Sequence, residues 1–170
     1  MSSMTNSAEE VMKIRQTADR VLATREDEIV TKVRQAVAEV LGREEEEIQP
    51  SASLIKDLNA ESLDFLDLLF RLESAFGIKI PRGGIQRATQ GSLTDAEFQQ
   101  NGILTEAALD RLRILMPEVD PARLQPGLTV RDIPSLFTSI TFARLVAWRI
   151  GEQPADAPNA AGAAAAENKA

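Results

Sequence analysis

Residues 58–81, LNAESLDFLDLLFRLESAFGIKIP, place a hydroxyl between two acids at the start of an apolar run. Ser62 directly follows Glu61 and stands two residues before Asp64. A serine at a helix start can accept a free backbone N–H, which contributes about 1 kcal/mol. The same hydroxyl can instead carry a phosphate ester, which the positive end of a helix dipole favours. The pattern therefore leaves two roles for Ser62, a helix cap or a point of attachment.

Two residue types much used in catalysis and metal binding are missing from the chain, which has 170 residues with no cysteine and no histidine. The lack of cysteine excludes disulfides, thiolate metal sites and a cysteine nucleophile. The lack of histidine removes the commonest general base and transition-metal ligand. A calcium loop starting at Asp57 also fits poorly, since position six is Ser62 instead of glycine and position twelve is Leu68 instead of glutamate. We predict neither an enzyme nor a metal site.

The charge and hydropathy of the chain exclude further classes of protein. The net charge is −7, and no basic face indicates nucleic-acid binding. No apolar run reaches the ~18 residues of a membrane span. The N-terminus lacks the basic-then-apolar pattern of a secretory signal. These features predict a cytoplasmic protein, without a nucleic-acid partner or a membrane span, whose partners are basic proteins.

Apolar spacing predicts helices along most of the chain. A capping-box pattern at Ser7 and Glu10 predicts an accessory helix over 8–23, and Thr24 a second helix that ends at Gly42. The loop that follows is expected to be pinned to the core by Ile48, Leu54, Ile55 and Leu58. The third helix spans 62–76 and ends at Gly77. Its expected core face consists of Leu66, Leu69, Leu72 and Phe76.

The second half of the chain shows weaker signals. The segment RGGIQRATQGS is typical of a loop, while Thr94 and Thr105 each open a helix, the second closed by Pro117. LTVRDIPSLF predicts a helix from about residue 132, which FARLVAWRI continues or restarts. Residues 151–170 lack bulky apolar residues and are predicted to be disordered. Few aromatics and scattered β-branched residues favour an all-α fold.

The stretch DLNAESLDFLDLLFRLESAFGIKIP resembles the signature of the acyl carrier protein family, and the match includes 26–42 and LTVRDIPSLF. The resemblance implies an acyl-carrier-like four-helix bundle. Here it is elaborated by an extra N-terminal helix, a helical insertion and an extended C-terminal helix. The expected organisation is an accessory helix over 1–25, a carrier domain over 26–150 with its insertion at 82–127, and the tail at 151–170.

The resemblance also implies a function. Ser62 carries 4′-phosphopantetheine, installed from coenzyme A by a phosphopantetheinyl transferase, and its thiol holds an acyl group as a thioester. The reactive chemistry then belongs to the cofactor, which fits a chain without cysteine. The other partners implied are acyl-loading, elongating and transferring enzymes of fatty acid and lipid biosynthesis, with basic docking surfaces.

Two sets of residues take roles from this resemblance. Those that correspond to the partner-docking face are Glu61, Leu63, Asp64, Asp67, Phe70 and Glu73. Those that correspond to acyl-chain or core contacts are Phe65, Leu66, Leu69 and Leu72.

The chain departs from the family pattern at three positions. Glu61 stands where aspartate is usual, Asn59 where glycine is common, and Arg71 puts a positive charge on an acidic face. SLDFLDLLF with FGIKIP and GSLTDAEF is similar to specialised carriers of very long acyl chains for lipid A. Two alternatives remain open: an aminoacyl or polyketide carrier, and a helical scaffold or regulatory protein that has lost the prosthetic arm.

Overall fold

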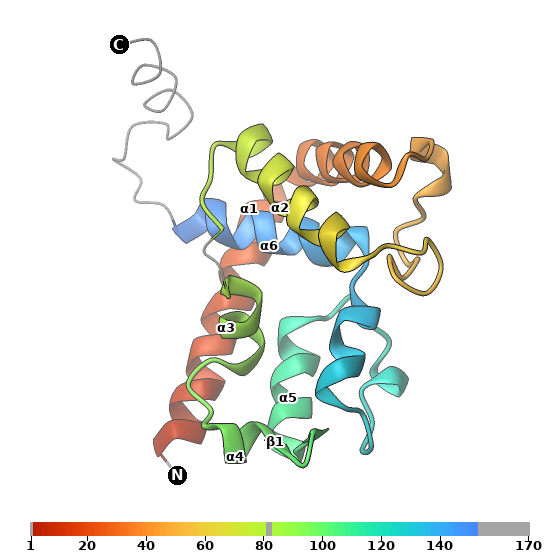
Figure 1. Ribbon diagram of the computed structural model, residues 1–170. Coiled ribbons are helices and arrows are strands. Elements are labelled where there is room, and N and C mark those ends of the chain that lie inside the picture. The colour runs from red at the N-terminus through yellow and green to blue at the C-terminus, as the bar shows by residue number, and fades with distance from the viewer. Residues whose placement is uncertain (1, 81–82, 153–170) are drawn as a thin grey trace, which may run out of the picture. The chain divides into compact units, whose positions relative to one another are not determined.

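A computed structural model describes residues 2–80 and 83–152. These residues are predominantly helical, which confirms the all-α prediction (Figure 1). The α-helices are α1 (Ser2–Leu41), α2 (Ser62–Phe76), α3 (Gly84–Gln90), α4 (Asp95–Phe98), α5 (Glu106–Leu115) and α6 (Ser139–Glu152). Three 3-10 segments are η1 (Glu45–Glu47), η2 (Pro121–Arg123) and η3 (Val130–Leu136). Strands β1 (Gln99–Gln100) and β2 (Ile103–Leu104) form an antiparallel hairpin, with Gln99 opposite Leu104.

The chain folds as two compact units. Unit 1 comprises Met1–Gln16 and Pro81–Phe137, and unit 2 comprises Thr17–Ile80 and Thr138–Ala170, so Ser62 belongs to unit 2. The boundaries expected at residues 25 and 150 stay a prediction. The expected disordered tail lies outside the described residues from 153 on, as does residue 82 of the expected insertion. No helix of the described part is long and apolar enough to cross a bilayer.

Unit 2 has a helical core built from residues 17–41 of α1 together with α2 and α6. Leu72 of α2 and Phe142 of α6 are fully buried, and Phe65 stacks on Phe142 with ring centroids 5.8 Å apart. The long loop before α2 is pinned as predicted by Ile48, Leu54 and Leu58, all buried, while Ile55 is half-buried. These contacts hold α2 against the core.

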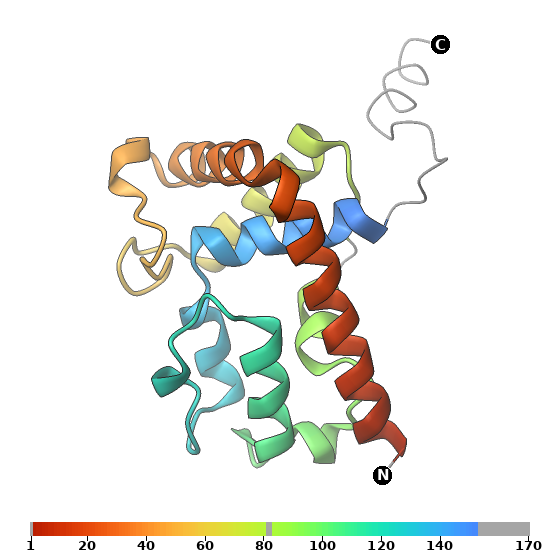
Figure 2. The same cartoon turned by 180° about the vertical axis from the view of Figure 1, so that it is seen from behind.

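The two helices predicted for residues 8–42 are both present, and they join at a break within α1. The predicted break falls at Arg25, whose φ of −131° and ψ of 21° are not helical, and the helix changes direction there (Figures 1 and 2). Thr24 does not cap a new helix, because its hydroxyl donates to the Val21 carbonyl at 3.3 Å. The Arg25 guanidinium instead forms two hydrogen bonds to Glu28, at 2.8 and 3.1 Å. The expected break is therefore a kink.

Unit 1 contains a helix that the sequence analysis assigned to a loop. Helix α3 forms over Gly84–Gln90 and packs on α5. The hairpin was also not predicted, because its strands are too short for an alternating pattern. The caps at Thr94 and Thr105 are confirmed, since their hydroxyls accept the N–H groups of Glu97 and Ala108 at 3.2 Å. After η3 the chain restarts a helix, α6, at Ser139.

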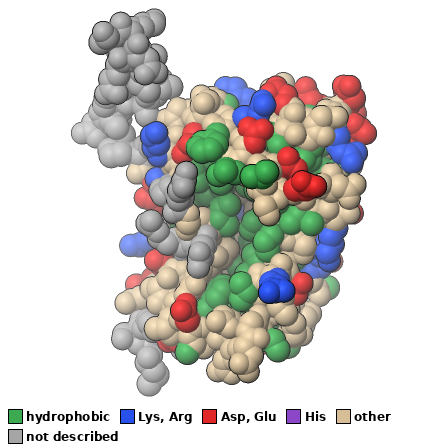
Figure 3. Space-filling view, viewed as in Figure 1, with side chains coloured by type: hydrophobic (Ala, Val, Ile, Leu, Met, Phe, Trp, Pro, Cys, Tyr) green, Lys and Arg blue, Asp and Glu red, His purple; other side chains and the backbone are tan. Residues whose placement is uncertain are grey.

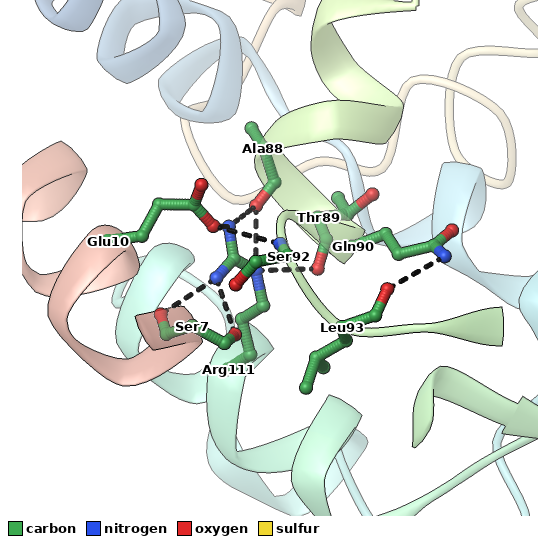
Figure 4. A network of polar contacts seen from close by, with 8 residues as sticks. All are labelled: Ser7, Glu10, Ala88, Thr89, Gln90, Ser92, Leu93 and Arg111. Atoms are coloured by element: carbon green, nitrogen blue, oxygen red, sulfur yellow. Dashed lines mark hydrogen bonds and ion pairs between the residues drawn. The ribbon is translucent and has the colours of Figure 1, made fainter. Parts of the chain in front are cut away.

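A buried guanidinium joins α1, α3 and α5 within unit 1 (Figure 4). Arg111 has a side chain 2% exposed and donates to the carbonyls of Ala88 and Thr89 at 2.8–3.1 Å. It also donates to both the hydroxyl and the carbonyl of Ser7, and pairs with Glu10 at 3.0 Å. Burial lowers the pKa of Arg111, and Glu10 opposes that shift.

This network explains why the predicted cap at Ser7 is wrong. Ser7 lies inside α1 and is buried, and both Ser7 and Glu10 serve Arg111 instead of the helix end. The Glu10 carboxylate also accepts the N–H of Ser92 at 3.1 Å. A Cβ at Gly91, whose φ is +57°, would overlap the Glu10 and Arg111 side chains. One buried cation and its acceptors thus link α1, α3 and α5 within unit 1.

We expect Arg111→Met to destabilise the protein by about 3–5 kcal/mol, because the buried acceptors and Glu10 lose their cation. Urea unfolding followed by circular dichroism measures the change. Arg131→Met, at an exposed arginine of the same unit, is the control and should change stability by less than about 0.5 kcal/mol. Equal stability of the two variants would contradict this role.

The contact between Arg25 and Glu28 at the kink leads to a second prediction. The hydrogen bond from Arg25 lowers the pKa of Glu28 to about 2. A carboxyl whose folded pKa is depressed adds stability above its unfolded pKa, and that stability is lost as pH falls toward the folded value. Carboxyl NMR titration should give a Glu28 midpoint well below the ordinary 4.5. Arg25→Gln should return it toward that value; an unchanged midpoint would exclude Arg25 as the cause.

Candidate functional site

The start of α2 is capped by two acids and not by Ser62. Glu61 is the N-cap residue with extended backbone, and its N–H donates to the Asp64 carboxylate at 2.8 Å. Such a capping box satisfies the helix end through the residues on either side of the first turn. Ser62 is the first residue of the helix itself. The predicted alternative, that Ser62 serves only as a helix cap, is therefore wrong.

The Ser62 hydroxyl is left accessible. Ser62 is exposed, and within the described part of the chain no residue forms a hydrogen bond with its side chain. Leu63 beside it is 75% exposed. The N–H groups of the first helical turn point away from the helix body at this end, and together with the dipole they favour a bound phosphate. The site fits a phosphate ester on the Ser62 oxygen.

The loop before the site is held in one conformation by its own hydrogen bonds. The Ser53 N–H donates to Asp57 at 2.8 Å, and the Ala60 N–H donates to the Leu54 carbonyl at 2.8 Å. Asn59 has φ of 60°, the left-handed region that glycine and asparagine adopt most readily. Asparagine at position 59, where the family commonly has glycine, is therefore compatible with this backbone conformation.

The outward face of α2 carries an apolar stripe. Leu63 and Phe70, the apolar residues predicted for docking, are exposed, with Phe70 at 53%. Leu66 was expected on the core face, but it is 44% exposed and lies three residues after Leu63, on the same side. In the space-filling view, hydrophobic side chains gather over α2 with carboxylates beside them (Figure 3). We call Leu63, Leu66 and Phe70 the α2 stripe.

The acids predicted for docking are largely engaged within the chain. Glu61 is exposed, and Asp64 accepts the Glu61 N–H. Asp67 pairs with Arg71 at 3.2 Å, and Glu73 accepts the Ile80 N–H at 2.6 Å. Arg71 also pairs with Glu39 of α1 at 2.8 Å, a partner 32 residues away that local spacing does not indicate.

The residues predicted for acyl or core contact separate into two groups. Leu72 is fully buried, and Phe65 and Leu69 are half-buried. Phe65 lines a small apolar hollow beside the start of α2, with room for about one water molecule. The hollow is lined by Val37, Val40, Leu41, Leu54, Ala60, Asp64, Phe65 and Leu68. Val37, Val40 and Leu41 stand at helical spacing in the sequence, but this spacing does not indicate a hollow.

No group of three or more acidic side chains in the described residues is arranged to hold a metal ion. The functional features of unit 2 are thus an accessible hydroxyl, an exposed apolar stripe and a small apolar hollow. Together they suit covalent attachment at Ser62 better than catalysis by the chain.

Comparison with known proteins points to the same site. Residues 31–100, which include Ser62, match the family model described as phosphopantetheine attachment site. This description agrees with the cofactor expected at Ser62, 4′-phosphopantetheine, and with the prediction of a carrier and not an enzyme.

Curated relatives are more specific. Residues of this chain are 42% identical over 52 positions to acyl carrier protein AcpXL of Brucella melitensis, covering 30% of this chain and 56% of that protein. The AcpXL of Rhizobium meliloti is 40% identical over 52 positions, with 30% and 55% covered. The chain thus spans about half the length of the curated relatives it matches. No solved structure matches it.

The left-handed residue in the loop allows a direct test. We expect Asn59→Ala to destabilise the protein by roughly 1–2 kcal/mol, because a Cβ-bearing residue without a polar side chain disfavours positive φ. Asn59→Gly is the matched variant and should stay near the wild type. Urea unfolding compares the two. If Asn59→Ala and Asn59→Gly lower the free energy of unfolding equally, the left-handed backbone conformation does not constrain this position.

Proposed function

We propose that the chain is a specialised acyl carrier protein that holds an acyl chain as a thioester on 4′-phosphopantetheine attached to Ser62. The observation that supports this most directly is the exposed Ser62 hydroxyl at the first turn of α2, with no partner among the described residues. The Ser62 oxygen forms a new bond to the β-phosphorus of coenzyme A. The bond to the adenosine bisphosphate moiety breaks, and the hydroxyl proton passes to a base of the transferase.

The residues around Ser62 have separate roles in this proposal. Glu61 and Asp64 close the helix end, so the serine oxygen is free to react. The N–H groups and dipole of α2 stabilise the phosphate once it is attached. The arm supplies the thiol that the chain lacks, and the acyl group is carried on it.

The acyl chain requires a place to lie, and the hollow lined by Phe65 and Leu68 offers an apolar space beside the start of α2. Its lining is entirely apolar apart from Asp64. We propose that the acyl chain widens it by displacing Phe65, which is only half-buried. The roles of Leu66, Leu69 and Leu72 in acyl contact stay predictions.

Partners follow from the same proposal. A phosphopantetheinyl transferase and the enzymes that load, elongate and transfer the acyl group dock on α2 near Ser62. The proposed docking residues are Glu61, Leu63, Asp64, Asp67, Phe70 and Glu73. The name of the AcpXL relatives supports an acyl carrier, and we propose lipid biosynthesis as the pathway and the cytoplasm as the location.

Intact-protein mass spectrometry tests the attachment. After coexpression with a transferase, the chain should gain the mass of one phosphopantetheine, and Ser62→Ala should gain none. Ser74→Ala, an exposed serine on the same helix, is the control and should be modified like the wild type. An unmodified wild type would support a scaffold that has lost the arm, and modification of Ser62→Ala would place the arm elsewhere.

A further inference from the structure

Arg71 forms ion pairs with two acidic side chains on the surface of unit 2. Its guanidinium lies 2.8 Å from Glu39 of α1 and 3.2 Å from Asp67 of α2. All three side chains are partly exposed, so the cluster faces solvent. Each pair alone adds little stability, because exposed ion pairs are worth about 0–1 kcal/mol. The cluster therefore matters more for the charge it presents than for the fold.

The charge along α2 is unequal at its two ends. Near Ser62, no cation in the described part of the chain pairs with Glu61 or Asp64, although Asp64 accepts a backbone N–H. Near Phe70, one cation, Arg71, pairs with both Asp67 and Glu39 and so offsets part of their charge. The face is thus fully acidic beside Ser62 and partly neutralised further along.

A surface hollow beside Phe70 shows the same balance. Its charged lining consists of two cations, Lys32 and Arg71, and two acids, Glu39 and Asp67. Lys32 also lies 3.5 Å from Glu28 and 5.5 Å from the centre of the Phe76 ring. A basic side chain of a partner would have to compete with Arg71 for both acids. An uncharged or apolar side chain meets no such competition.

We propose that Arg71 is a built-in counter-charge that selects partners with an apolar docking face. This rests on the proposed carrier function. The occupant is an enzyme surface whose apolar side chains cover the α2 stripe of Leu63, Leu66 and Phe70. Its basic residues lie only opposite Glu61 and Asp64, and uncharged polar groups face the hollow beside Phe70. Docking at the Phe70 end then depends on apolar burial and not on ion pairs.

Salt separates these two kinds of docking, because exposed charges are screened over about 10 Å at 0.1 M salt while apolar contact is not weakened. The probe is a phosphopantetheinyl transferase whose docking surface is basic along its whole length, so that its cations also lie opposite Asp67. The readout is its KM for the apo form of the chain, with coenzyme A, at low and high NaCl. Arg71→Gln frees Asp67 and Glu39, so KM at low salt should fall and its rise with salt should steepen by about threefold or more.

Arg43→Gln is the matched control, because Arg43 also pairs with an acid on the surface of unit 2, Glu47 at 3.6 Å, and its loss changes net charge equally. It should keep the wild-type salt dependence, as should Arg71→Lys, which keeps the charge. Phe70→Ala should raise KM by a similar factor at both salt concentrations. Circular dichroism confirms that each variant is folded.

The outcomes distinguish this inference from the proposed function. If Arg71→Gln and Arg43→Gln share one salt dependence while the wild type is modified at Ser62, the counter-charge role is overturned and the carrier function stands. The same holds if Phe70→Ala leaves KM unchanged. If the wild type is not modified at all, the carrier function fails first.

Discussion

The hydrogen bond from the Glu61 N–H to the Asp64 carboxylate, 2.8 Å long, is the contact on which the site depends. A helix start leaves four N–H groups without partners, and a serine there is a common acceptor. Because Asp64 turns back to the N-cap residue, the helix end is closed without Ser62. The hydroxyl remains exposed at a position where phosphate is favoured. Two acids thus leave the Ser62 hydroxyl without a capping role, as the proposed attachment requires.

The rest of unit 2 keeps that helix end in place. Leu68 and Leu72 are buried under α2, and Phe65 stacks on Phe142 of α6. At the other end, Gly77 closes the helix with φ of 64°, and Glu73 accepts the Ile80 N–H. Helix α2 is therefore fixed at both ends and along its inner side. A prosthetic arm on Ser62 would be mobile while its point of attachment is not.

Local signals predicted α2 well, and non-local contacts explain the failures elsewhere. The bounds 62–76 followed from apolar spacing and Gly77, which act within a few residues. Ser7 was mistaken for a cap because its true partner, Arg111, lies 104 residues away in the sequence. Helix α3 was missed for the same reason, since the carbonyls of Ala88 and Thr89 are satisfied by that arginine. No window of sequence contains both halves of this network.

The exposure of Leu66 shows a different reason why a sequence-based prediction failed, and this one concerns the candidate site itself. Helix α2 has apolar residues on nearly every side, so spacing alone could not tell its packed face from its open one. The core has room for Leu68 and Leu72, and this leaves Leu63, Leu66 and Phe70 outside. Apolar side chains that the core does not need are favoured only if another surface covers them. The exposed stripe and the pairing of Asp67 with Arg71 together support the proposed partner, one that binds α2 by burying apolar area beside Ser62.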